Sequence, residues 1–211
     1  MIQIFSDMEL KKVIESRTSV RSFLPDSVPV QDVIEMVRLG GLAPSINNFQ
    51  PWEFILIQNK NILQAMAKLV IQRLAEFPLK NSKASANVKS QVEWYSTFFK
   101  DAPALLAILL TKYETILEGG VELTAQEINE MRNYPDLQST GACIQNILLS
   151  ATDMGYGACW LSGPLVAKKE LETVLGIEKP SRLISFIAIG KPAKDFKPKD
   201  KEDLGKKLRI V

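Results

Sequence analysis

Residues 104–110 read Ala104-Leu105-Leu106-Ala107-Ile108-Leu109-Leu110, a run of seven consecutive apolar residues. The run lacks the alternation of a strand with one wet face, so it favours a β-strand that is covered on both faces. Periodicity alone also allows a short buried helix. We interpret the run as a central strand of a sheet.

Helices and strands alternate on both sides of this strand. Apolar residues at i, i+3, i+4 and i+7 predict one helix behind Pro29 that stops at Gly40-Gly41, and a core helix at Ile144–Ala151 that is ended by Gly155 and Gly157. Runs of β-branched and aromatic residues between turn residues predict strands. The predicted helices cover about residues 10–16, 30–40, 62–76, 144–151 and 167–175, and the predicted strands cover 52–57, 158–161 and 183–189.

Other segments are predicted from their polar and turn residues. Pro78 and the polar stretch Lys80–Ser90 predict a connector, and Ser6-Asp7-Met8-Glu9 spells a capping box for the first helix. Residues 111–135 predict a surface excursion, in which a second capping box, Thr124-Ala125-Gln126-Glu127, begins a short helix. A lid over a binding site is one possible role of this excursion. Residues 191–211 carry eight Lys or Arg and four Asp or Glu, so this basic tail is either disordered or lies on another surface such as a partner subunit.

The composition is typical of one soluble domain that spans residues 1–211. The chain is 46% hydrophobic and 24% charged, and its net charge of +2 argues against nucleic acid and anionic membranes as partners. No apolar run approaches the roughly 18 residues of a membrane helix, and no signal peptide is evident. Cys143 and Cys159 form neither a disulfide framework nor a metal-ligand pair, so we expect two small core residues in a cytoplasmic protein.

The chain contains no histidine. This excludes the Ser-His-Asp triad, the Cys-His pair and imidazole metal sites. The acidic residues show no compact pairing for acid–base catalysis either. If the protein is an enzyme, we therefore expect a bound organic cofactor to supply the chemistry, with no metal and no catalytic side chain.

Three segments have compositions that suit a flat, phosphorylated ligand. Arg17, Ser19 and Arg21 would share one side of an extended segment, although a solvated basic edge explains them as well. The loop Ala43–Trp52 is rich in amides that suit the edge of a heteroaromatic ring, and an ordinary helix-to-strand turn is the alternative. Gly155–Pro164 is rich in small residues that admit a flat ligand, but it lacks the order of a dinucleotide fingerprint.

Together these segments resemble the nitroreductase family of flavoproteins. The matching stretches are Arg17-Thr18-Ser19-Val20-Arg21-Ser22-Phe23, the loop Ala43–Trp52, the helix with Gln145-Asn146-Ile147 leading into Gly155-Tyr156-Gly157-Ala158-Cys159-Trp160, and Phe186–Pro192. They occur in the family's order. The resemblance implies a three-layer α+β fold with a central, mostly antiparallel sheet flanked by helices. It also implies a homodimer with one FMN per subunit at the interface and a C-terminal tail exchanged with the partner subunit.

The resemblance also implies a set of FMN contacts. Arg21 would lie near flavin N1 and O2, where a positive charge stabilises the reduced, anionic flavin. The loop would reach the ring from the neighbouring subunit, the 161–163 backbone would face N5, and a basic pair near the C-terminus, with Lys206 as an alternate, would complete the phosphate site. The implied contacts are Arg17, Thr18, Ser19, Arg21, Pro44, Ser45, Ile46, Asn48, Gln50, Leu161, Ser162, Gly163, Lys207 and Arg209.

The function implied is an FMN-dependent oxidoreductase. A ping-pong cycle would pass hydride from NADH or NADPH to a nitroaromatic, quinone or enone. Reductive dehalogenation, flavin breakdown and flavin storage remain alternatives. The sequence departs from some nitroreductases at Trp94–Asp101, where an Asn and a Lys are expected, so Trp94, Tyr95, Phe98 and Phe99 either pack in a core or dimer interface or stack on a flat substrate.

Overall fold

A computed structural model describes residues 9–78, 83–113, 116–203, 205 and 207–211. Its centre is a four-stranded antiparallel sheet in the order β1-β2-β4-β3. The strands are β1 (Trp52–Ile57), β2 (Ala104–Leu110), β3 (Gly157–Leu161) and β4 (Arg182–Gly190). All seven residues of β2 are buried, which confirms the strand reading over the helical one.

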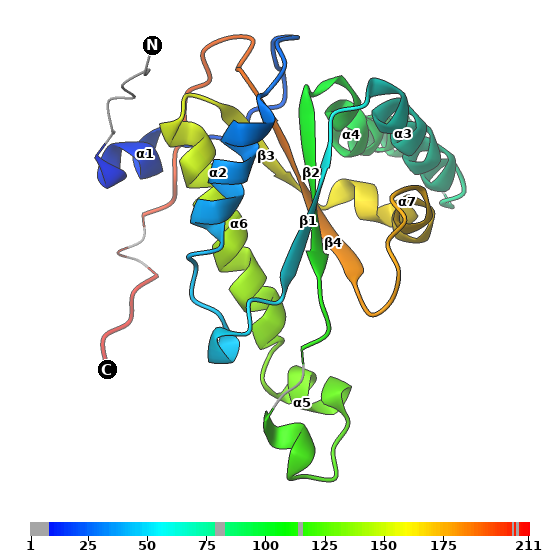
Figure 1. Cartoon of the computed structure of the whole chain (residues 1–211). Coiled ribbons are helices and arrows are strands. Elements are labelled where there is room, and N and C mark those ends of the chain that lie inside the picture. The colour runs from blue at the N-terminus through cyan, green and yellow to red at the C-terminus, as the bar shows by residue number, and fades with distance from the viewer. Residues whose placement is uncertain (1–8, 79–82, 114–115, 204, 206) are drawn as a thin grey trace.

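The sheet is the middle of three layers. Helices α1 (Leu10–Ser16), α2 (Val30–Gly40) and α6 (Pro135–Asp153) lie on one side, and α3 (Lys60–Ala75), α4 (Lys83–Thr97) and α7 (Lys168–Val174) lie on the other (Figure 1). Alternate residues of β2 enter two separate cores. Leu105, Ala107 and Leu109 pack on the α3 side, whereas Ala104, Leu106 and Ile108 pack on the α6 side. The expected three-layer α+β fold is confirmed.

Helix α6 is the longest helix among the described residues, and it backs the sheet. Its stripe of Ile144, Ile147, Leu148 and Ala151 is buried, as the spacing predicts. Helix α2 crosses it closely, because a Cβ at Gly40 would lie 2.5 Å from Cγ1 of Ile147. After α6 the chain turns at Gly155, which has a φ of +76°, a conformation that glycine adopts without strain.

The segment after β2 extends past the end of the sheet (Figure 1). It carries the short helix α5 (Ala125–Met131). The predicted capping box is complete, because the Thr124 side chain accepts from the Glu127 N–H and the Glu127 side chain accepts from the Thr124 N–H. Four 3₁₀ turns complete the described elements, at Ile46–Asn48, Phe98–Asp101, Ile116–Gly119 and Gly163–Ala167. No helix of the described residues is long and apolar enough to cross a membrane.

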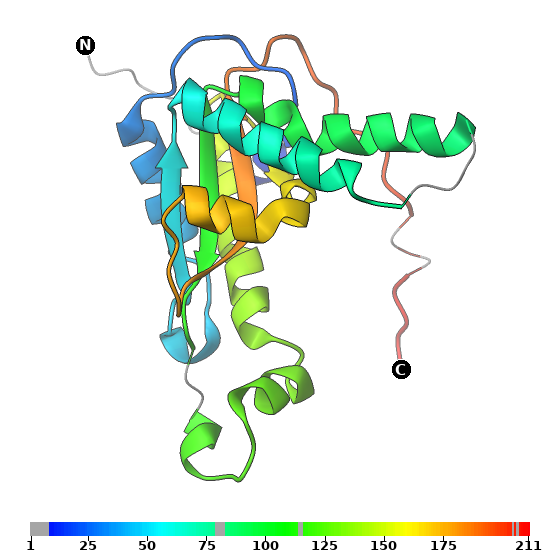
Figure 2. The same cartoon turned by 90° about the vertical axis from the view of Figure 1, so that its right-hand side faces the viewer.

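The predicted connector at Lys80–Ser90 is wrong from Lys83 onward, where α4 begins. The helix extends beyond the sheet layer (Figure 2). Because this part does not pack on the sheet, its sequence lacks the continuous apolar stripe by which a helix is predicted. The capping-box prediction at Ser6 lies outside the described residues. Glu9, which precedes α1, makes no side-chain cap.

Candidate functional site

The segment Arg17–Arg21 lies along β3, the edge strand of the sheet. Ser19 forms a parallel bridge with Ala158, and the Val20 N–H donates to the Ala158 carbonyl oxygen at 3.1 Å. Val20 is buried, whereas Arg17, Ser19 and Arg21 are half-buried. The chain therefore presents two guanidinium groups and a hydroxyl along one edge of the sheet, in the extended form that their spacing predicts.

These side chains line a cationic hollow of about 120 Å³. The basic tail forms its other wall, and none of the described residues that line it is acidic. Guanidinium groups bind phosphate through several charge-assisted hydrogen bonds, so this end of the site fits the phosphate of FMN. The lining residues are Arg17, Thr18, Ser19, Arg21, Pro198, Lys199 and Lys201.

The last turn of α4 joins Arg21 to the segment after β3. The Arg21 guanidinium carbon lies 5.3 Å from the centre of the Tyr95 ring. One residue further on, Ser96 packs on Gly163 so closely that a Cβ at position 163 would lie 2.7 Å from the Ser96 Oγ. Arg21 and Gly163, which are far apart in the sequence, thus flank the same helix end.

The aromatic residues before β2 divide into two pairs. Phe98 and Phe99 are buried, which confirms the packing alternative for these two. Trp94 and Tyr95 are 52% and 45% exposed. Their rings meet edge-to-face with centroids 4.8 Å apart, so an exposed aromatic surface adjoins Arg21.

Both cysteines are buried and unpaired, as predicted. Burial raises the pKa of the Cys143 thiol to about 12. Burial also raises the pKa of Cys159, and this outweighs the opposing effects of Arg21, Ser19 and Arg17. Cys159 therefore lies in β3, next to the cationic segment, as a neutral thiol.

The loop Ala43–Trp52 has three residues in the left-handed region of backbone conformation. Asn47, Asn48 and Gln50 have φ values of 50°, 56° and 55°, in the left-handed region that non-glycine residues seldom adopt. Hydrogen bonds hold this conformation: the Gln50 N–H donates to Ser45 Oγ at 3.1 Å, and Gln50 Nε2 donates to Asn48 Oδ1 at 3.2 Å. Pro44, Asn48 and Gln50 are left exposed.

Within one chain this loop does not meet the cationic hollow. The Ile46 N–H donates to Ser139 Oγ at 3.1 Å, near the start of α6. The cationic segment pairs with β3, just beyond the far end of the same helix. From Ser139 to Asp153 the helix rises about 20 Å. One chain therefore holds two separate halves of the site that the sequence predicts.

The C-terminal basic pair, Lys207 and Arg209, is not among the residues that line the hollow. Lys207 forms an ion pair with Glu202, and Lys207 and Arg209 are exposed. Lys199 and Lys201 lie at the hollow instead. Sequence reasoning did not single them out, because the tail's charge is spread over many lysines. Lys206 lies outside the described residues.

The sequence model of the nitroreductase family matches residues 14–191. This chain belongs to the nitroreductase family. The matched region contains the segment Arg17–Arg21, the loop Ala43–Trp52 and all four strands, whereas the tail residues that line the hollow follow it in the sequence.

Two curated relatives illustrate the range of this family's names. YfhC of Bacillus subtilis (strain 168), whose name places it among NAD(P)H nitroreductases, is 27% identical over 190 residues, which cover 90% of this chain and 88% of that protein. An iodotyrosine deiodinase of Hydra vulgaris is 25% identical over 199 residues, which cover 92% of this chain and 68% of that protein.

Solved structures share the fold over nearly the whole chain. A BluB-like flavoprotein from Clostridium difficile 630 superposes with a TM-score of 0.85 and 29% identity, and the match covers 97% of this chain and 99% of that one. A nitroreductase with bound FMN from Desulfitobacterium hafniense DCB-2 gives a TM-score of 0.73 at 19% identity, covering 97% and 99% of the two chains.

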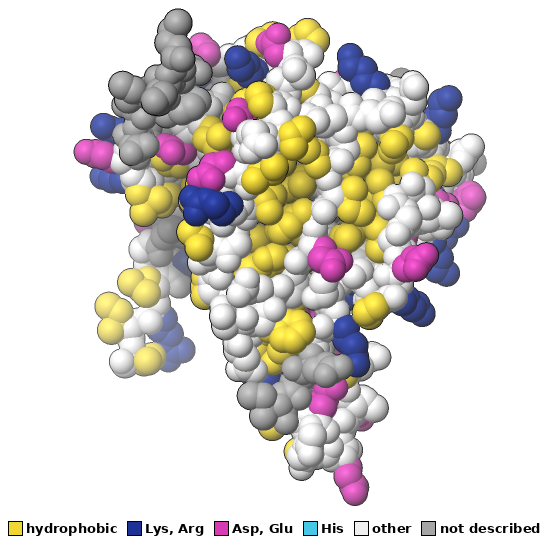
Figure 3. Space-filling view, in the orientation of Figure 1, with side chains coloured by type: hydrophobic (Ala, Val, Ile, Leu, Met, Phe, Trp, Pro, Cys, Tyr) yellow, Lys and Arg dark blue, Asp and Glu magenta, His cyan; other side chains and the backbone are white. Residues whose placement is uncertain are grey.

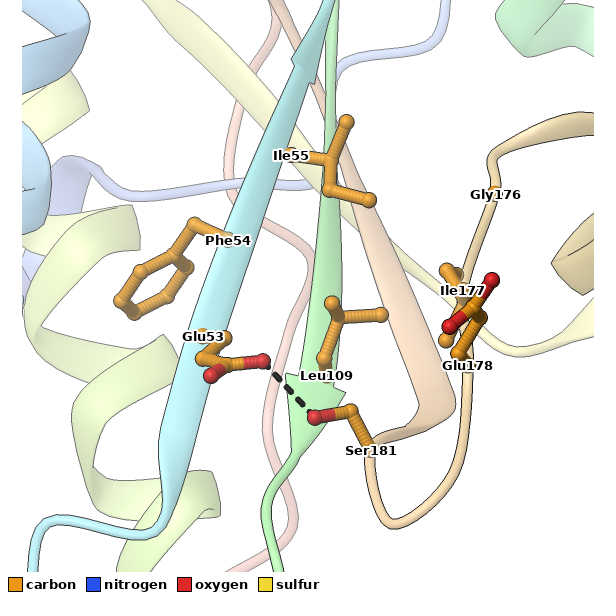
Figure 4. A pocket seen from close by; sticks show the side chains of 8 residues that line it. All are labelled: Glu53, Phe54, Ile55, Leu109, Gly176, Ile177, Glu178 and Ser181. Carbon is orange, nitrogen blue, oxygen red and sulfur yellow. Dashed lines mark hydrogen bonds between the residues drawn. The ribbon is translucent and has the colours of Figure 1, made fainter.

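The opposite edge of this nitroreductase-family sheet carries a second hollow, of about 390 Å³. It lies between β1 and the turn that precedes β4, and Ser181 Oγ donates to Glu53 Oε2 there at 2.9 Å (Figure 4). Hydrophobic side chains gather on both sides of β1 on this face (Figure 3). None of the predicted site residues lines this hollow.

Proposed function

We propose that this chain, as a single domain over residues 1–211, is an FMN-dependent oxidoreductase. The observation that carries the proposal is the cationic hollow of Arg17, Ser19 and Arg21, which lies along β3 in a chain with the nitroreductase fold. Bound FMN would supply hydride transfer from NADH or NADPH to a nitroaromatic, quinone or similar acceptor in a ping-pong cycle.

The protein's part in this function is binding and orientation. Arg17, Thr18 and Ser19 bind the phosphate and the chain next to it, with Lys207 and Arg209 as further candidates. Arg21 provides a positive charge at the pyrimidine edge of the ring. The backbone of Leu161, Ser162 and Gly163 lies beside the reacting face, where Gly163 leaves no room for a side chain beside Ser96. Water can supply the acceptor's proton in an open site, so no side chain needs to act as an acid.

We further propose that the active form is a homodimer with FMN at the interface. The separation of the 43–52 loop from the hollow supports this, because Pro44, Ser45, Ile46, Asn48 and Gln50 can complete a site in a second copy that they do not reach in their own. Isologous contacts between two copies would form two such sites.

An exchange of C-terminal tails fits the same dimer. Leu208, Ile210 and Val211 are 72%, 89% and 104% exposed within one chain. On the described part of the sheet, β1 is an edge strand with one unpaired side; it carries Glu53, and Glu178 lines the same hollow. An unpaired edge beside acidic groups suits a basic, apolar tail from the partner. Deleting residues 208–211 should shift the dimer towards monomer in sedimentation velocity.

The decisive test of function is anaerobic reduction of the FMN-loaded protein. NADH or NADPH should bleach the flavin band, and a nitroaromatic or quinone added afterwards should restore it through many turnovers. Comparing NADH with NADPH determines the preferred donor. A protein that holds FMN but is reduced by neither nicotinamide would contradict this function and favour flavin binding or storage, or a flavin reaction with another electron donor.

Reductive dehalogenation is the second candidate, because an iodotyrosine deiodinase is among the relatives. The same reduced protein should be mixed anaerobically with a halogenated phenol. Release of halide with reoxidation of the flavin, without reoxidation by nitroaromatics, would favour this reaction over the first.

A further inference from the structure

The last turn of α4 carries an exposed aromatic pair that the core does not explain. Trp94 and Tyr95 are both about half exposed, although the next two residues, Ser96 and Thr97, are buried. The Trp94 ring contacts Tyr95 edge-to-face at 4.8 Å and lies 5.9 Å from the buried ring of Phe98. The Tyr95 ring is therefore braced through Trp94 against the core.

The braced ring has a cation beside it. The Arg21 guanidinium carbon is 5.3 Å from the Tyr95 centroid, within the range of a cation–π interaction. A hydrogen bond from Arg21 Nη1 to the Ser19 carbonyl oxygen is long, at 3.4 Å, and holds the group weakly. An arginine side chain loses much rotamer freedom when it is fixed, so a rigid partner matters for its placement.

We infer that Tyr95 is a positioning residue, which holds the Arg21 guanidinium in place toward the flavin. The inference rests on the proposed function, since Arg21 is taken to face the pyrimidine edge of FMN. A fixed positive charge there favours the reduced, negatively charged flavin over the neutral oxidised one. Tyr95 thus raises the affinity for reduced FMN more than that for oxidised FMN.

The test compares Tyr95→Leu, which removes the ring, with Tyr95→Phe, which keeps it. Val92→Ala serves as the control, because Val92 is an exposed residue of the same helix. The readouts are the dissociation constant of oxidised FMN and the midpoint potential of bound FMN, which together give the dissociation constant of the reduced form. We expect Tyr95→Leu to lower the preference for reduced FMN about two- to five-fold, the effect of an exposed cation–π contact. Tyr95→Phe and Val92→Ala should retain it.

A second background tests whether the effect passes through Arg21. In Arg21→Gln protein, Tyr95→Leu should change neither constant further. A double-mutant cycle on unfolding of the FMN-free protein should also show coupling between the two positions. This second readout needs no flavin, so it separates a failure of the contact from a failure of the proposed function.

Several results would overturn the inference. They are a Tyr95→Leu protein with the wild-type potential, an equal effect in the Arg21→Gln background, a Tyr95→Phe protein that behaves like Tyr95→Leu, or an absence of coupling in the FMN-free protein. Wild-type protein that binds no FMN would overturn the proposed function instead, even where the cycle shows coupling.

Discussion

Gly157 and Val20 pack so closely that a Cβ at position 157 would lie 2.7 Å from Cβ and Cγ2 of Val20. This close approach lets the segment Arg17–Arg21 lie against β3 and place its arginines along the sheet edge. The glycine thus connects core packing to the candidate site, because any side chain there must push the cationic segment outward.

Gly157→Ala should therefore harm both stability and binding. We expect a loss of about 1–3 kcal/mol in the free energy of unfolding, which is typical of overpacking, together with weaker FMN binding. Urea unfolding and FMN titration measure the two effects. Gly141→Ala is the matched control, since its Cβ would meet the Trp160 ring at an ordinary 3.9 Å. Equal behaviour of the two variants would refute the packing argument.

Arg17→Ala tests the phosphate assignment. Loss of one charge-assisted contact should weaken FMN binding about 10- to 100-fold, whereas riboflavin, which lacks the phosphate, should bind equally well to both proteins. Arg38→Ala is a suitable control, because Arg38 is an exposed residue that pairs with Glu35 on α2. Unchanged FMN affinity would remove Arg17 from the site.

Substitutions in the tail test which of its basic residues contact FMN, Lys199 and Lys201 or Lys207 and Arg209. Because Lys199 and Lys201 line the hollow, replacing both with alanine should weaken FMN binding and reduce its dependence on salt. The variant Lys207→Ala/Arg209→Ala reports on the pair that the family resemblance implies. If only this second variant weakens binding, the tail takes a different path in the FMN-bound protein from the one seen in the single chain.

The buried thiol of Cys143 predicts how stability depends on pH. Its pKa is raised from 9.0 to about 12 in the folded chain, so the unfolded chain releases this proton first. The neutral, buried Cys143 thiol therefore makes its full contribution to the free energy of unfolding below pH 9, and this contribution is lost as the pH rises towards 12. Tyr156, whose pKa is raised to about 12 by burial and by its hydrogen bond to Asp32, acts in the same direction.

Urea unfolding at pH 8 and pH 10 checks this prediction. The free energy of unfolding should fall between the two values, and it should fall less in Cys143→Ala, although that variant starts from a lower stability. Parallel declines in the two proteins would show that Cys143 does not contribute.

Much of the fold could be predicted because its elements carry strong local signals. The seven apolar residues of β2 favour a strand that is buried on both faces, and the apolar stripe of α6 favours a helix that buries one face. Helix α4 was not predicted at all, because it extends past the sheet and its first turns carry little apolar pattern. The Arg21–Tyr95 contact could not be predicted either, since it joins residues 74 positions apart through tertiary packing alone.

The central claim is that the chain binds FMN, and the visible absorption spectrum tests it most directly. Purified protein should be incubated with excess FMN and passed through a gel-filtration column. The account predicts a retained flavin band at about one FMN per chain, in a peak that elutes as a dimer. A folded, dimeric protein that emerges colourless would contradict the claim, and the nitroreductase resemblance would then describe the scaffold alone.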